Sequence, residues 1–215
     1  MVCDSRTLLL AFGGIMGRIG IPPFEFFSLT GRMPVKRLFV RDLRQAWYHL
    51  GIPHHGSTIP GVAESLNRLI EPHEVDRLVV AGTSAGGYAA LVFGTLLGAD
   101  TVLCFSPQTT IDPDILAGMD DHRWDDRLGA LAATGALDAR WTDLRDAMPR
   151  ARCAETSYNL YFDHSLRGDR LHAERLADLE GVRMFRFGRG GHNIVRALRE
   201  IGALERVLRS ALIEA

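Results

Sequence analysis

The sequence predicts an α/β fold of three layers, in which a mostly parallel sheet of about six strands carries helices on both faces. Three observations lead to this prediction. Short apolar runs bounded by glycine or polar turns alternate with segments of helical spacing along nearly the whole chain. A length of 215 residues with 47% hydrophobic residues suffices for one substantial core. No repeat or linker interrupts the chain, so we expect residues 1–215 to form a single domain.

Five apolar runs have the length and composition of buried strands. They are Thr7–Phe12, Lys36–Val40, Arg77–Ala81, Thr101–Ser106 and Tyr158–Phe162. A sixth candidate, Arg183–Phe187, alternates arginine with apolar side chains, which is typical of an edge strand with one solvent-exposed face.

Helices are predicted where apolar residues recur at spacings of three and four. These segments are Leu43–Leu50, Gly61–Ile70, Ala85–Leu97, Arg170–Leu179 and Asn193–Leu212. Between residues 107 and 153 the alternation of strands and helices stops, and acidic clusters, tryptophans and Gly/Pro breaks take its place. We interpret 107–153, called the excursion below, as a short helical cap that covers a site.

Composition excludes several classes of function. The formal net charge is -1, so nothing indicates nucleic-acid binding, and a small molecule is the expected partner. Three cysteines without CxxC spacing support neither a disulfide framework nor a zinc site. The apolar run Thr7–Gly17 is too short to cross a bilayer and is flanked by Asp4 and Arg18. We therefore expect a cytoplasmic protein that does not bind a membrane.

The run VVAGTSAGGYAAL, residues 79–91, contains the pattern G-x-S-x-G at the junction of a predicted strand and a predicted helix. In a nucleophile elbow this pattern leaves the serine on a tight turn with its hydroxyl exposed above the sheet, and the glycines avoid collisions with neighbouring backbone. Spacing excludes a dinucleotide-binding loop and a P-loop. A glycine-lined turn without catalytic function is the alternative. We interpret Ser84 as a nucleophile.

A catalytic triad also needs a histidine and an acid, which in this architecture follow the serine in chain order on loops after later strands. His192 lies in GRGGHN, directly after the last predicted strand and before the final helix, and is the predicted base. The loop after Tyr158–Phe162 offers Asp163 and Asp169 as the acid. Asp169 could instead be a plain helix N-cap, and Asp163 could orient the loop.

We favour Asp169 because a triad acid usually lies a few residues beyond its strand, and Asp163 remains the alternative. Asp112 and Asp114, which follow the preceding strand, are weaker candidates for the acid than either of these two. For the oxyanion hole, the backbone N–H of Ala85 is expected to act with one from the glycine pair after the first strand. Gly14 is preferred over Gly13 in that pair.

Three further residues follow strand ends, where the ligand crevice of an open α/β sheet lies. They are Arg41, Asp42 and Gln108, and we expect them to contact the substrate, with a loop-anchoring ion pair or a plain turn as the alternative. Phenylalanines that follow the glycine pair could form an apolar wall for an acyl group, but core packing is the simpler interpretation. They are Phe24, Phe26 and Phe27.

Taken together, FGG, GTSAGG, the Asp163/Asp169 loop and GGHN resemble the α/β-hydrolase superfamily over nearly the whole chain. The chain departs from that family in two ways. Phe12-Gly13 replaces the histidine-glycine pair that often opens the oxyanion loop, and there is no room for the N-terminal antiparallel strands of larger members.

The resemblance implies Ser-His-acid chemistry on an acyl substrate, free or attached to a carrier, without a cofactor or a metal. Hydrolysis of an ester or thioester is the expected reaction. Acyl transfer with the same triad and a non-catalytic binding protein on the same fold are the alternatives.

Overall fold

The centre of the protein is a parallel sheet of six strands in the order β2-β1-β3-β4-β5-β6. The structure, a computed structural model, describes residues 4–15, 25–152 and 154–214. The strands are β1 (Thr7–Phe12), β2 (Lys36–Val40), β3 (Arg77–Thr83), β4 (Thr101–Phe105), β5 (Ser157–Asp163) and β6 (Val182–Phe187). All six predicted strands are confirmed with small shifts at their ends, and the arginine-rich β6 lies at an edge as predicted.

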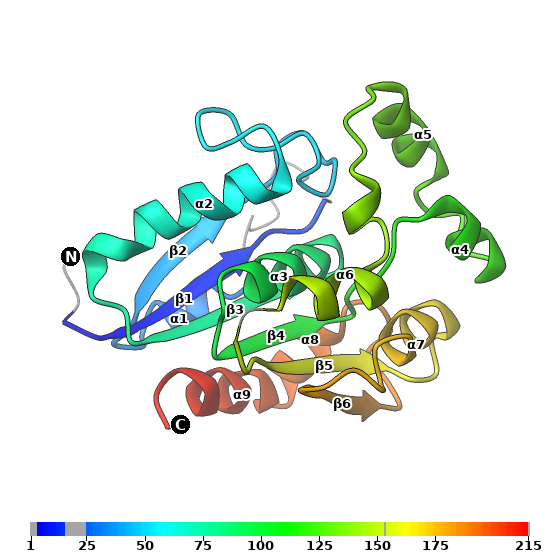
Figure 1. Ribbon diagram of the computed structural model, residues 1–215. Helices are drawn as coiled ribbons and strands as arrows, with labels where there is room; N and C mark the ends of the chain where they lie inside the picture. The colour runs from blue at the N-terminus through cyan, green and yellow to red at the C-terminus, as the bar shows by residue number, and fades with distance from the viewer. Residues whose placement is uncertain (1–3, 16–24, 153, 215) are drawn as a thin grey trace.

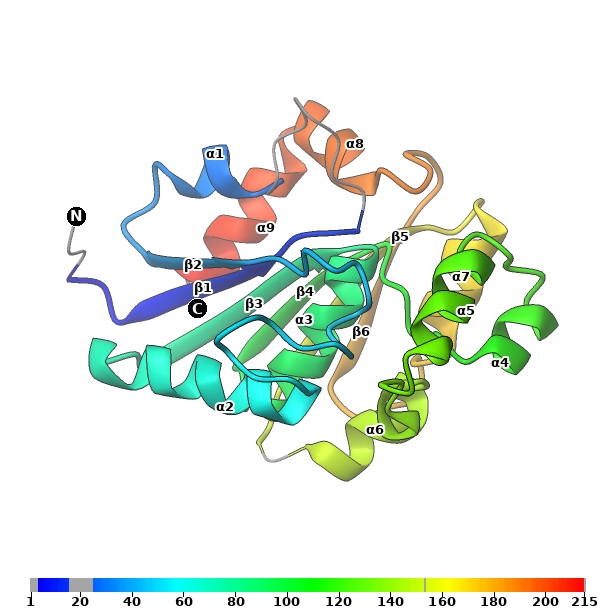
Figure 2. The same cartoon turned by 90° about the horizontal axis from the view of Figure 1, so that it is seen from above.

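Helices flank the sheet on both faces (Figures 1 and 2). In chain order they are α1 (Phe27–Thr30), α2 (Ile59–Ile70), η1 (Glu71–His73), α3 (Ala85–Leu96), α4 (Pro113–Gly118), α5 (Asp125–Ala133), η2 (Ala139–Trp141), α6 (Leu144–Ala151), α7 (Arg167–Glu174), α8 (Ile194–Glu200) and α9 (Ala203–Leu212). The three-layer α/β prediction is therefore confirmed. None of the helices in the described ranges is long and apolar enough to span a membrane.

Alternation of side chains along the strands divides the core into two clusters, one on each face of the sheet. In β1, Leu8 and Leu10 pack with α2, α3, α6 and α7, whereas Leu9 and Ala11 pack with α8 and α9. Strands covered on both faces must be apolar throughout, and β1, β3 and β4 are buried along nearly their whole length. Because all strands are parallel, their carboxyl ends meet at one edge of the sheet.

The excursion is helical in its described part, as predicted, and contains α4, α5, η2 and α6. Figures 1 and 2 show α4 and α5 on the side of the molecule toward which β5 runs, where α7 also lies. Arg167 at the start of α7 donates to the carbonyl oxygen of Met119 after α4 at 2.6 Å. A bridge between Thr110 and Asp143 closes the base of the excursion.

The helix predicted at Arg170–Leu179 is instead α7, Arg167–Glu174, and residues 175–178 form turns. Two further helix predictions are wrong, each for a local reason. Residues 43–50 form turns, because the Asp42 carboxylate accepts backbone N–H groups of this segment, and Gln45, Trp47 and Tyr48 have positive φ. The apolar spacing there reflects burial of Trp47 and Tyr48 in the core. The predicted helix 193–212 is divided into α8 and α9, because Gly202 takes the left-handed conformation with φ of 67°.

His49 connects three separate parts of the fold. Its ring is buried, Nδ1 accepts the N–H of Asp138 at 3.0 Å, and Nε2 lies 3.2 Å from the Tyr88 hydroxyl. Because the Tyr88 hydroxyl donates to the Trp141 carbonyl oxygen, the His49 Nε2–H must donate to Tyr88. The ring is therefore neutral, and burial lowers the pKa of His49 to about 4.

We predict that His49 makes the fold less stable as pH falls. Its pKa is lower in the folded state than in the unfolded chain, so the unfolded chain binds more protons between about pH 6.5 and 4, and stability decreases through that window. From pH 7 to 5 the loss attributable to this residue is about 2 kcal/mol. Urea unfolding at both pH values measures it, with His49→Asn as the reference. Equal pH dependence in the two proteins would contradict the prediction.

Candidate active site

Ser84 lies between the end of β3 at Thr83 and the start of α3 at Ala85. Its φ of 56° and ψ of -120° are unfavourable for a residue with a side chain, so the surrounding backbone must hold it in place. The flanking glycines permit this. A Cβ on Gly82 would come 1.9 Å from the Gly86 carbonyl oxygen, and one on Gly86 would come 2.5 Å from the Phe12 carbonyl oxygen. The turn has the geometry of a nucleophile elbow.

His192 lies on the loop between β6 and α8, and its Nε2 is 2.9 Å from the Ser84 Oγ. The next residue, Asn193, is the N-cap of α8, and its side chain accepts the Arg196 N–H. The helix start therefore fixes the loop from one side. The His192 side chain is 40% exposed, which leaves the imidazole accessible from solvent.

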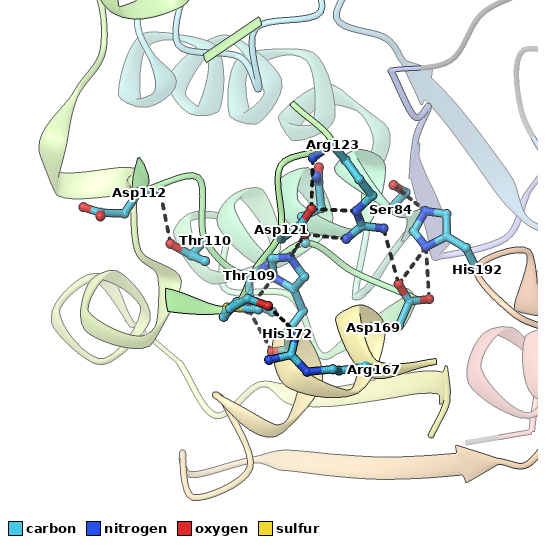
Figure 3. Close-up of polar contacts among 12 residues, drawn as sticks. Ser84, Thr109, Thr110, Asp112, Asp121, Arg123, Arg167, Asp169, His172 and His192 are labelled. Carbon is cyan, nitrogen blue, oxygen red and sulfur yellow. Dashed lines mark hydrogen bonds and ion pairs between the residues drawn. The ribbon is translucent and has the colours of Figure 1, made fainter. Parts of the chain in front are cut away.

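Asp169 completes the chain of hydrogen bonds shown in Figure 3. Its two carboxylate oxygens lie 2.8 and 3.0 Å from the His192 Nδ1, and its side chain is 1% exposed. The expectation that Asp169 could be an N-cap is wrong, because α7 begins at Arg167 with Leu166 as its N-cap. Asp169 lies instead in the first turn of α7, where the helix dipole favours a negative charge.

The alternative acid, Asp163, has a different set of partners. It accepts the N–H and hydroxyl of Ser165 at 2.9 and 2.6 Å, and the N–H of Gly191 at 2.8 Å. Burial opposes its charge, but these hydrogen bonds keep the pKa of the Asp163 carboxyl below its ordinary value. Because Gly191 directly precedes His192, Asp163 holds the loop that carries the imidazole. Asp112, considered as a more distant choice, is the N-cap of α4.

The two glycines after β1 differ in the use of their N–H groups. Gly13 donates to the Val40 carbonyl oxygen at 3.0 Å, which corrects the expectation that it could donate to an oxyanion. For the Gly14 N–H, no acceptor is found within the described ranges. Ala85 is the first residue of α3, and its N–H is among the four that a helix leaves without an intrahelical acceptor.

Asp42 and Gln108 serve the scaffold around the site. Asp42 is buried and accepts N–H groups of the following loop at 2.7 to 3.1 Å, so the expectation that its carboxylate contacts the substrate is wrong. Gln108 is also buried, and its Oε1 accepts the Trp47 Nε1–H at 2.8 Å. Its backbone N–H donates to the Ser84 carbonyl oxygen at 3.2 Å. Arg41 is half-buried, and its contact with a substrate stays a prediction.

The phenylalanines expected to form an acyl wall or pack in the core are found in different surroundings. Phe26 is buried and packs with Phe105 at a ring distance of 5.4 Å, as core packing predicts. Phe27 is 55% exposed and lies against Phe39. Phe24 is outside the described residues.

Sequence reasoning missed three polar residues next to the triad. Arg123, from the excursion, lies with its Nη1 3.7 Å from an Asp169 oxygen, and Asp121 and the buried His172 support it (Figure 3). The sequence DHRWDD around Arg123 has no motif beyond its acidic composition, and a histidine inside a predicted amphipathic helix carries none either. Among the described residues, no three His, Cys, Asp or Glu side chains gather as a metal site.

Comparisons with known proteins support the fold. No model of a protein family matches the sequence, and no curated protein matches it. Among solved structures, the α/β hydrolase MGS-MChE2 from a sediment metagenome of the Mar Chica lagoon, Morocco, matches with a TM-score of 0.60 at 12% identity over 94% of this chain and 90% of that chain. Esterase PE8 matches with a TM-score of 0.54 at 14% sequence identity, over 96% of this chain and 92% of the esterase chain. MenH from S. aureus matches with a TM-score of 0.53 at 11% sequence identity, over 94% of this chain and 92% of the MenH chain.

We predict that the elbow glycines are a condition of folding. Gly82→Ala places a Cβ against the Gly86 backbone, which cannot move away without displacing Ser84, so the loss of stability exceeds about 2 kcal/mol. Gly129 in α5 has open space around it, and Gly129→Ala is expected to gain about 0.5 to 1 kcal/mol. Urea unfolding midpoints of both variants test this contrast. A Gly82→Ala protein as stable as the parent would show that the turn can relax.

Proposed function

We propose that this chain, which has the α/β-hydrolase fold, is a serine hydrolase that cleaves a small-molecule ester or thioester through an acyl-enzyme on Ser84. One observation carries the proposal. The Ser84 Oγ, both ring nitrogens of His192 and the buried Asp169 carboxylate form one continuous chain of hydrogen bonds, with the serine on a strained elbow. Strain at a residue that already has a base within hydrogen-bond distance favours a reactive role over a structural one.

In the acylation step, His192 accepts the Ser84 hydroxyl proton on Nε2 as Oγ attacks the carbonyl carbon of the substrate. The Nδ1–H of His192 remains hydrogen-bonded to Asp169, which stabilises the imidazolium. The proton on Nε2 then passes to the leaving alcohol or thiol as the bond to the acyl carbon breaks. The product of this step is an ester between Ser84 and the acyl group.

In the deacylation step, a water takes the place of the leaving group and gives a proton to His192 as it attacks the acyl carbon. His192 returns this proton to the Ser84 Oγ as the bond between Oγ and the acyl carbon breaks, which releases the carboxylic acid and restores the serine. In both steps, negative charge develops on the carbonyl oxygen. The Ala85 N–H at the start of α3 and the Gly14 N–H after β1 are the proposed donors to this oxyanion. If an alcohol or amine replaced water, the same residues would catalyse acyl transfer.

Titration of the intact protein with a fluorophosphonate probe tests the nucleophile. We expect covalent labelling of Ser84 in the parent protein and none in Ser84→Ala, because an activated serine attacks phosphorus as it attacks an acyl carbon. Mass spectrometry of the labelled peptide locates the modification. A folded parent protein that stays unlabelled would support a binding protein without turnover.

The class of substrate is tested with p-nitrophenyl esters and acyl thioesters of graded chain length. Turnover of one series, abolished in Ser84→Ala, is the expected result. Labelling without turnover, together with product formation when an alcohol or amine is added, would favour an acyltransferase.

Substitution of each aspartate distinguishes the roles of Asp169 and Asp163 by the effect on kcat. Asp169→Asn removes the charge that faces the imidazolium, so kcat is expected to fall roughly 10³- to 10⁴-fold. Asp163→Asn keeps an oxygen that can accept the Gly191 N–H, so a loss of about tenfold or less is expected. Steady-state kinetics on one ester series measures both. The reverse ranking would assign the acid role to Asp163.

A further inference from the structure

The Asp169 carboxylate has a charged partner besides His192. Its Oδ1 lies 3.7 Å from the Nη1 of Arg123, which comes from the excursion between α4 and α5. Figure 3 shows the guanidinium between Asp121 and Asp169, and the contacts from Arg123 and His192 meet at the Asp169 carboxylate, where the His192 Nδ1 lies 2.8 Å from the same Oδ1. Since the Asp169 side chain is 1% exposed, water contributes little to the stabilisation of its charge. The nearby cation therefore matters more than an ion pair on the surface would.

Asp121 holds Arg123 in this position. Two parallel hydrogen bonds join the residues, from Nε to Oδ1 at 2.8 Å and from Nη2 to Oδ2 at 2.6 Å. The Asp121 Oδ1 also accepts the Arg123 backbone N–H at 3.2 Å, so the same carboxylate fixes backbone and side chain. Burial opposes the charge of Asp121, but the bonds from Arg123 and His172 keep the pKa of its carboxyl below the ordinary value.

His172 anchors Asp121 to α7. The backbone N–H of Thr109 lies 3.1 Å from the His172 Nδ1, which must therefore carry a lone pair. The ring proton is then on Nε2, which donates to the Asp121 Oδ2 at 3.1 Å. Both side chains are almost fully buried, at 1% and 4% exposed. Since His172 and Asp169 share α7, the chain of contacts starts and ends on one helix and passes through the excursion.

We propose that Arg123 is a positioning residue that acts through Asp169, holding the buried carboxylate toward the His192 Nδ1 by contact with the Oδ1 that both residues share. This inference rests on the proposed serine hydrolase. The guanidinium has two effects there. It limits rotation of the carboxylate, which keeps the His192 ring directed at Ser84, and it opposes the accumulation of positive charge on the imidazole.

The excursion supplies a matched control for this proposal. Arg140 pairs with Asp138, two residues before it, through Nε–Oδ1 and Nη2–Oδ2 bonds of 3.0 and 2.6 Å, the same arrangement as Arg123 with Asp121. The Arg140 side chain is 74% exposed and pairs with Asp138, which is not a member of the proposed triad. Arg140→Gln therefore removes an equivalent Asp-Arg pair from the excursion without altering the triad.

Two assays are run as a function of pH at low ionic strength. The first measures the second-order rate constant for labelling of Ser84 by an uncharged fluorophosphonate. The second measures kcat and KM for an uncharged p-nitrophenyl ester. For Arg123→Gln we expect a rate roughly tenfold lower, with the loss in kcat and not in KM. We also expect the acidic limb of the pH profile to move up by roughly half a pH unit, because a neighbouring positive charge is gone. Arg123→Lys should recover the position of the limb, and Arg140→Gln should behave as the parent.

Three outcomes would overturn the proposal. A rate loss in Arg123→Gln with an unmoved acidic limb would indicate a purely structural contribution. A rise in KM confined to an anionic ester, such as p-nitrophenyl hemisuccinate, would make Arg123 a substrate-binding residue. Parent-like rates would make the contact with Asp169 irrelevant. In contrast, a parent protein whose Ser84 is never labelled would overturn the proposed function itself, so the two failures are distinguishable.

Discussion

The backbone conformation of Ser84 is the constraint on which the rest of the site depends. A non-glycine residue with φ of 56° at a strand-helix junction is stable only if the backbone on both sides can approach closely, and Gly82 and Gly86 allow that approach. The parallel sheet then determines what lies near the serine. Because the carboxyl ends of all strands share one edge, the loops after β1, β5 and β6 bring the glycine pair, the two aspartates and the histidine to the same place.

The carboxylates on either side of the connection between β5 and α7 have different surroundings and different partners. Asp163, the last residue of β5, faces backbone N–H and hydroxyl donors, and it holds the main chain just before His192. Asp169 is one helical turn into the following segment and faces the imidazole itself. One carboxylate thus fixes where the loop is, and the other fixes how the ring is turned. Distance from the strand end, and not residue type, separates these tasks.

The strands, the turn around Ser84 and the placement of His192 and the two aspartates after later strands could be predicted from sequence, because each depends on local patterns: short apolar runs, glycine spacing and position after a strand. Two predictions failed because backbone N–H groups have acceptors that the local sequence pattern does not reveal. Asp42 accepts the N–H groups that a helix at 43–50 would have used, and Gly13 donates its N–H to Val40. The Arg123 contact could not be predicted at all, because it joins segments far apart in the sequence through a turn centred on Asp121.

The position of Arg123 bears on how the charge of a buried triad acid is balanced. With a neutral imidazole, His192 gives Asp169 an N–H dipole, and Arg123 supplies the full positive charge. In the proposed reaction, transfer of the Ser84 proton to His192 leaves Asp169 facing two cations, so the gain from the new imidazolium is smaller than it would be for an otherwise unpaired carboxylate. Because Arg123 comes from the excursion, residues 107–153 supply a second charged partner for the carboxylate that faces His192.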